Sequence, residues 1–384
     1  MLFFIFLFFY IMRRIALLLI IVSSSMLRIS GQKAITNLPA IEKGEILIVG
    51  EDKFLDEILK IDLEIVEHYA SLNKESDLYV FLDLPSCYNM FVDEYFSNRG
   101  SSGLKEFLKG TQAGYKAKYI FELFSGLRAA DMHSNRLKVV CISGNKPAGA
   151  TLLSIEHLIM NSPKLPEHYR QFAGKCKELR QSEQSGRLEF ERLVSEFSDM
   201  FTDDKDKLRE VMQERDLAFL TMLLDDIAYT NDECVEVMGR NILKHYDKDA
   251  VFISINDAAN ANKQSIEFDN RYSKGTKSLA FAMDNSPEFA GKVHSLYITA
   301  QKVILPETVL DGGNVVPSKA ITNINWRIPE DIYDEMRGSD ESVSINLPDP
   351  KSRRDVHSKF DGFILFKEAH SAMPGNKERL ELWD

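Results

Sequence analysis

Residues 44–59 read GEILIVGEDKFLDEIL, and this stretch decides the fold. Ile46 to Val49 form a short apolar run rich in β-branched residues, and Gly50 ends it, which is typical of a strand buried on both faces. Apolar residues then recur at helical spacing from Lys53 to Leu72 as one broad stripe. A buried strand followed directly by an amphipathic helix predicts the first half of a βαβ unit.

The same alternation continues along the chain. Leu78 to Leu82 and Leu137 to Ile142 are predicted strands, and Ser86 to Phe96 and Tyr115 to His133 are predicted helices. Ala250 to Ile255 is a predicted fourth strand. Strands separated by helices form right-handed crossovers between parallel strands. The predicted fold class is therefore α/β, with a mostly parallel central sheet flanked by helices and with a helical insertion.

One α/β domain is expected over residues 45–375. Its helical insertion is predicted at residues 151–230, where the pattern is almost entirely helical and highly charged. Residues 302–360 carry five prolines, so long surface loops are expected there. Val293 to Thr299 and Gly362 to Phe366 are further predicted strands on either side of that irregular segment.

The beginning of the chain resembles a secretory signal peptide, predicted over residues 1–31. Arg13 and Arg14 precede the apolar run Ile15 to Val22, and small residues follow it. A start at Met12 would give this segment the usual proportions. The chain is therefore expected to be exported, periplasmic or extracellular, without a stable membrane span after cleavage. The alternative is an uncleaved signal-anchor.

The charge balance argues against one class of partner. The chain has 47 Lys and Arg residues against 58 Asp and Glu residues, which gives a formal net charge of −11. A surface with this excess of negative charge repels phosphate backbones. No nucleic-acid partner is therefore expected.

Polar side chains follow each of the first four predicted strands. Ligands collect at the carboxyl ends of the strands of an open parallel sheet. These side chains should therefore line one polar crevice. The candidates there are Glu51, Lys53, Asp83, Ser143, Asn256 and Asp257.

Several of these residues stand in motifs that resemble a known superfamily. The motifs are Gly50-Glu51-Asp52-Lys53, Phe81-Leu82-Asp83-Leu84-Pro85, Glu214-Arg215-Asp216, and the late Phe360-Asp361-Gly362 and Ala372-Met373-Pro374. Together, and in this order, they resemble the superfamily of erythromycin esterases, ChaN-like haem-uptake proteins and Tiki/TraB proteases. The resemblance covers residues 45–375.

The resemblance implies a catalytic set of Glu51, Lys53, Asp83 and Arg215, with Ser143, Asn256 and Asp257 as ligand-binding residues. In that family the first motif reads Gly-Glu-x-His, and Lys53 stands where the histidine belongs. The turn after the fourth strand has no second histidine. Asp83, one methylene shorter, stands where the family has a glutamate after strand two, and Ser143 stands where it has an acidic residue after strand three. Only Glu51 and Arg215 match in full.

These replacements change the available chemistry. Histidine exchanges a proton near neutral pH, whereas a lysine beside carboxylates stays protonated. We therefore expect Lys53 to form an ion pair with Glu51, Asp52 or Asp83. The remaining oxygen ligands would suit calcium or magnesium better than zinc. No metal or other cofactor is predicted, and haem or a divalent cation are the alternatives.

The leading hypothesis is a catalytically degenerate binding protein for an unknown small molecule or peptide. One alternative is an active ester or peptide hydrolase with a rearranged carboxylate, lysine and arginine site. The other alternative is a carrier for haem or another apolar small molecule, with an aromatic helix around Tyr119 lining the pocket.

Overall fold

The computed structural model describes most of the chain after residue 37. The described residues are 38–52, 55–97, 102–111, 114–134, 136–144, 147–182, 187–227, 234–263, 278–304, 308–311, 314–317, 342–346 and 360–371. All of them belong to one compact unit, Asn37–Asp384. The predicted signal peptide at residues 1–31 and the candidate Lys53 lie outside the described residues.

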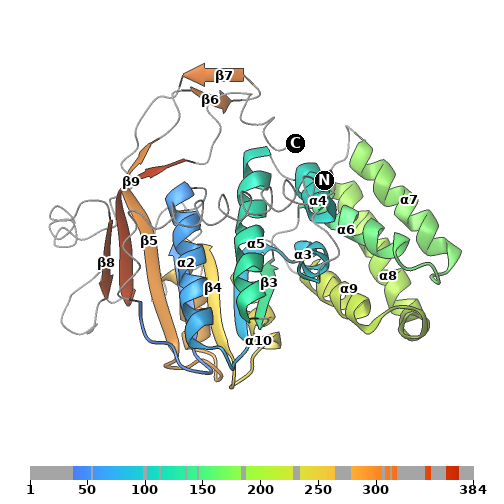
Figure 1. The fold of residues 1–384 in the computed structure, drawn as a ribbon. Helices are drawn as coiled ribbons and strands as arrows, with labels where there is room; N and C mark the ends of the chain where they lie inside the picture. Colours follow the sequence, from blue (N-terminus) through green and yellow to red (C-terminus); the bar gives the residue numbers. More distant parts are fainter. Residues whose placement is uncertain are drawn as a thin grey trace, which may run out of the picture. The chain divides into compact units, whose positions relative to one another are not determined.

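A seven-stranded sheet forms the centre of this unit, with strand order β3-β2-β4-β1-β5-β9-β8 (Figure 1). Its strands are β1 (Ile46–Glu51), β2 (Leu78–Pro85), β3 (Leu137–Ser143), β4 (Val251–Asp257), β5 (Val293–Ile304), β8 (Ser342–Asn346) and β9 (Gly362–His370). Every pairing from β3 to β9 is parallel, and only β8 pairs antiparallel. The predicted α/β fold with a mostly parallel sheet is confirmed.

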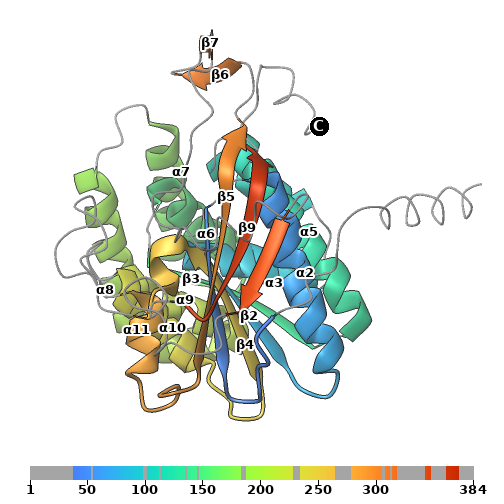
Figure 2. The same cartoon turned by 90° about the vertical axis from the view of Figure 1, so that its left-hand side faces the viewer.

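Helices cover both faces of the sheet. In the edge-on view, α2 and α5 lie on one side of the sheet, and α10 and α11 lie on the other (Figure 2). A further group, α6 to α9, lies beyond the β3 edge (Figure 1). The helices are α2 (Asp56–Leu72), η1 (Ser86–Tyr88), α3 (Asn89–Phe96), α4 (Ser102–Thr111), α5 (Gly114–Ser134), α6 (Ala148–Met160), α7 (Glu167–Gln181), α8 (Arg187–Val211), α9 (Glu214–Ile227), α10 (Cys234–Lys244), η3 (Ala258–Ala261) and α11 (Leu279–Asp284). Within the described residues, no helix has both the length and the apolar character that crossing a bilayer requires.

The central strand β1 is enclosed on all sides. It pairs with β4 along one edge and with β5 along the other, and all six of its residues are buried. Ile46 and Ile48 belong to a core cluster with Phe252 of β4 and Phe289. Burying apolar surface on this scale is the main favourable contribution to folding.

Gly50 allows a close approach at the end of β1. A Cβ atom on this residue would lie 2.6 Å from the Cβ of Ala261 and 3.0 Å from backbone atoms of Ala258. The short helix η3 therefore packs directly on the backbone of β1, because position 50 has no side chain. This contact holds the segment that follows β4 against β1, directly before Glu51.

On the outer edge of β3, a side chain forms hydrogen bonds with the backbone of Cys141. Asn89 of α3 donates a hydrogen bond to the carbonyl of Cys141 at 2.8 Å and accepts one from its N–H at 2.7 Å. Both residues are buried. The amide thus pairs with the strand as another strand's backbone would, and it holds α3 against the sheet.

Short strands lie in the parts of residues 302–360 that the structure describes, the range where long surface loops are expected. The strands β6 (Thr308–Asp311) and β7 (Asn314–Pro317) pair as an antiparallel two-stranded sheet, and β8 extends the main sheet next to β9. Pro317 ends β7, where its missing N–H does no harm, and the other four prolines of the range lie outside the described residues.

The substitution Gly50→Ala should lower the free energy of unfolding by about 1–3 kcal/mol, because the new methyl group would overlap Ala261 and the backbone of Ala258. Gly174→Ala is the matched control: Gly174 is exposed on α7 and has nothing within 4 Å of the Cβ position. It should be stabilising by about 0.5–1 kcal/mol. Urea unfolding measures the free energy of unfolding of both variants. Equal changes in the two variants would contradict the close packing at Gly50.

Replacing Asn89 with alanine should cost roughly 2–4 kcal/mol of unfolding free energy, because two buried backbone groups of Cys141 lose their partners. Asn285→Ala removes an exposed side-chain hydrogen bond to the carbonyl of Phe281 and should stay within about 0.5 kcal/mol. If Asn89→Ala changes the free energy of unfolding only slightly in the same urea titrations, the Asn89 amide does not stabilise the edge of β3.

Candidate functional site

Glu51 at the carboxyl end of β1 has a second carboxyl group beside it. This neighbour is Asp62, on the buried face of α2. The exposed fraction is 6% for Glu51 and 1% for Asp62, so both groups are withdrawn from water. Two carboxyl groups at such a place cannot both carry a negative charge without a large cost.

The pair is expected to share a proton. Burial raises the pKa of the Asp62 carboxyl well above its usual range, and the charge of Glu51 and a hydrogen bond to it raise that pKa further. This shift favours a protonated Asp62 carboxyl group that donates a hydrogen bond toward Glu51. Such a proton-sharing pair can take part in acid–base chemistry, or it can simply be the least costly way to bury two acids.

The predicted crevice residues are distributed over both faces of the sheet. Asp257 is in register with Glu51 on the adjacent strand, so the two side chains point to the same face. Asn256 is in register with Gly50, on the opposite face, where it donates a hydrogen bond to Ser254 at 2.8 Å. The end of β4 thus provides one residue to the Glu51 face and one to the other.

The two candidates at the ends of β2 and β3 lie nearer the edge of the sheet. Asp83 is half-buried where the register of β2 against β3 shifts. Ser143 is buried, and its hydroxyl lies 3.7 Å from the sulfur of Cys234. Because β4 lies between β2 and β1 in the sheet, both candidates belong to strands that are not neighbours of the strand that carries Glu51.

Asp52 has its own partners on β5. Its carboxylate accepts a hydrogen bond from the hydroxyl of Thr299 at 2.6 Å, and the hydroxyl of Tyr297 lies 3.5 Å away. Thr299 and Tyr297 are both buried. This cluster anchors the chain directly after Glu51 to the neighbouring strand.

Three histidines near the sheet have partners other than Glu51. His370, at the end of β9, pairs with Glu57 of α2 at 2.8 Å, and its side chain is 58% exposed. His294, at the start of β5, pairs with Glu45 at 3.0 Å. His245 packs against aromatic rings of β2.

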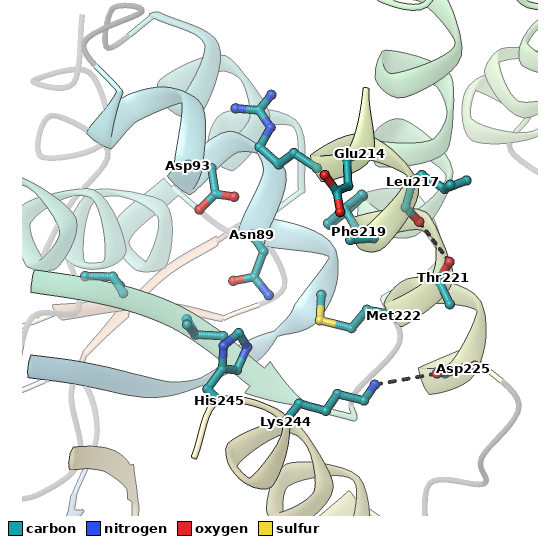
Figure 3. A pocket seen from close by; sticks show the side chains of 14 residues that line it. Asn89, Asp93, Glu214, Leu217, Phe219, Thr221, Met222, Asp225, Lys244 and His245 are labelled. Carbon is teal, nitrogen blue, oxygen red and sulfur yellow. Dashed lines mark hydrogen bonds and ion pairs between the residues drawn. The ribbon is translucent and has the colours of Figure 1, made fainter. Parts of the chain in front are cut away.

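Arg215 lies in a different hollow, a pocket beside the β3 edge (Figure 3). Its cavity volume is about 570 Å³, and its walls come from α3, β3, α9 and the end of α10. The guanidinium pairs with Asp216 at 3.2 Å. Glu51, Asp83 and Asp257 are not among the residues that line this pocket.

The same pocket contains two titratable groups that sequence reasoning did not single out. Loss of surrounding water raises the pKa of Asp93 to about 6, although Arg215 opposes this shift, and the side chain remains reachable from the pocket. Burial lowers the pKa of His245, with a smaller contribution from Lys244. His245 is therefore neutral at neutral pH.

The sequence contained a signal for Asp62 but none for the pocket. Asp62 lies four residues after Ile58 and four before Val66, so a carboxylate interrupts the apolar stripe of α2. Asp93 and His245 are far apart in the sequence and share no motif. Among the described residues, no group of three or more His, Cys, Asp or Glu side chains could hold a metal ion.

Replacing Asp62 with asparagine should change how stability depends on pH. Because the folded pKa of Asp62 is raised, the native protein loses stability as pH rises through the range above the usual value of 3.8. The amide of the variant would have no proton to lose. Asp62→Asn should therefore gain stability relative to the native chain as pH rises above about 4.

Glu67→Gln, on the exposed side of the same helix, is the control and should show no such trend. Urea unfolding at several pH values measures the difference. If the native and Asp62→Asn proteins differ in unfolding free energy by the same amount at every pH, the two carboxyl groups do not share a proton.

Comparison with known proteins gives a match in fold. No protein-family profile matches the chain, and no curated protein is similar to it in sequence. A histidine-to-asparagine mutant of the erythromycin esterase EreC, in its open conformation, superposes with a TM-score of 0.57 at 12% identity, covering 87% of this chain and 93% of that one. A Bacillus cereus protein gives a TM-score of 0.54 at 12% identity, covering 87% and 91%. The resemblance inferred from the motifs is confirmed at the level of structure: the chain has the fold of an erythromycin esterase.

Proposed function

We propose that this chain is a binding protein that uses an erythromycin-esterase-type fold without hydrolysing its ligand. The observation that supports this most directly is the environment of Glu51. The buried neighbour of Glu51 is the carboxyl group of Asp62. At the position where the family motif has an imidazole, this sequence has Lys53.

The missing imidazole matters because hydrolysis needs a group that takes and returns a proton near neutral pH. Imidazole does so because its pKa is about 6.5, whereas lysine is fully protonated there. His294 and His370 are engaged with Glu45 and Glu57. This pattern supports a function by binding.

The active-hydrolase alternative has one observation in its favour. The raised pKa of Asp62 favours a protonated carboxyl group beside Glu51. Acid–base enzymes divide the roles of acid and base between two such groups. In that scheme Glu51 would be the base, but Arg215, its expected partner, lines a pocket whose walls do not include Glu51. We therefore prefer the binding function.

We propose a small molecule or a peptide as the ligand, with haem as the apolar alternative. We also propose that the chain is exported to the periplasm or the extracellular space, on the pattern of residues 1–31 alone.

The purified protein should turn over p-nitrophenyl esters, lactones and peptides no faster than its Glu51→Gln variant, with or without added Mg²⁺, Ca²⁺ or Zn²⁺. The reason is that the motif carries a cationic lysine, Lys53, in place of the imidazole that would exchange protons near neutral pH. Glu67→Gln, an exposed change on α2, is the control for handling and folding. Turnover that Glu51→Gln abolishes and Glu67→Gln retains would overturn the proposal in favour of the hydrolase.

A further inference from the structure

We propose that the pocket beside β3 binds an amphipathic organic amine, with the apolar body of the ligand between α9 and the sheet edge and its protonated nitrogen at Asp93 and Glu214. This names a ligand class and a place for the proposed binding function, and it rests on that function. The pocket is separate from the carboxyl pair at the end of β1.

The size and the walls of the pocket suit a small organic molecule. A volume of about 570 Å³ lies within the range in which proteins bind small ligands, roughly 300–1,000 Å³. Apolar side chains come from the strand edge on one side and from α9 on the other. They include Val139, Val140, Leu217, Phe219 and Met222. A flat or branched hydrocarbon body would find apolar surface on both sides.

Four of the charged side chains that line the pocket lie on opposite sides of Met222. In Figure 3, Asp93 and Glu214 are on one side of Met222, and Lys244 and Asp225 are on the other. The second pair is an ion pair, with 3.5 Å between its charged atoms. A ligand that lies along the pocket would therefore have its charged end near Asp93 and Glu214.

The charges of the pocket are not balanced. Its lining has three carboxylates, Asp93, Glu214 and Asp225, and two cations, Arg215 and Lys244. Lys244 pairs with Asp225, and Arg215 pairs with Asp216 and also acts on the charge of Asp93. Asp93 and Glu214 line the same pocket, and among the described residues neither carboxylate has an ion-pair partner within 4.0 Å. The lining therefore carries one more negative than positive charge, and this excess favours a cation and repels an anion.

The state of Asp93 supports the same conclusion. Its pKa of about 6 reflects the cost of ionising a carboxyl group among protein atoms, which Arg215 reduces only in part and to which Glu94 adds. A cationic ligand beside it would remove the cost and hold the carboxylate in its charged form. Hydrogen bonds between an ammonium group and a carboxylate are also about twice as strong as neutral ones.

Three probes with one body and different head groups test this proposal on the full chain. They are 1-naphthylmethylamine, 1-naphthylmethanol and 1-naphthoic acid, titrated by calorimetry near neutral pH. The amine should bind at least about tenfold more tightly than the alcohol, because it alone gains charge-assisted hydrogen bonds. The carboxylate should bind more weakly than the alcohol.

Substitutions locate the site. Asp93→Asn and Glu214→Gln should each bring the amine close to the affinity of the alcohol and leave the alcohol unchanged. Glu189→Gln, an exposed change at the start of α8, should leave all three affinities unchanged. Thermal unfolding of each variant verifies that it is folded.

The outcomes separate the two proposals. Equal binding of amine and alcohol, tightest binding of the carboxylate, or binding of none of the three would overturn the pocket assignment and leave the absence of hydrolysis untouched. Ester turnover that depends on Glu51 would overturn the non-hydrolytic function without changing the predicted order of the three probes.

Discussion

The structure depends on the contact between η3 and the backbone of β1 at Gly50. At this point the strand in the middle of the sheet touches the chain that leaves the neighbouring strand β4, with no side chain between them. The contact sets the depth at which β1 ends, and hence the burial of Glu51 directly after it. A carboxyl group at that depth needs a proton or a cation nearby, and Asp62 meets this need from α2 by keeping its own proton.

Much of the fold was predictable because its central elements have strong local signals. The apolar run before Gly50 and the stripe that follows it define a strand and a helix without any knowledge of tertiary structure. The order of the strands was not predictable in the same way. β4 lies between β2 and β1 although a long helical segment separates it from both in the sequence. Local patterns do not encode such long-range placement.

The site was predictable only in part, for the same reason. Glu51 and Asp257 come together because parallel strands in register end at one edge, which follows from the topology. The place of Arg215 depends on how α9 packs beside β3, and no motif specifies that. Asp62 could have been found, because a lone carboxylate on the buried face of α2 requires an explanation. Asp93 and His245 could not, since only the packing of α3 and α10 brings them to one cavity.

The amide of Asn89 has a consequence beyond the stability of α3. An open strand edge is a template on which a strand of another molecule can add, and parallel sheets of this kind end in two such edges. At β3 the available donor and acceptor of Cys141 are already taken by a side chain that is part of the same molecule. At Cys141, β3 therefore offers no free backbone donor or acceptor to a strand of another molecule, and this part of the edge is a poor template for intermolecular β-structure.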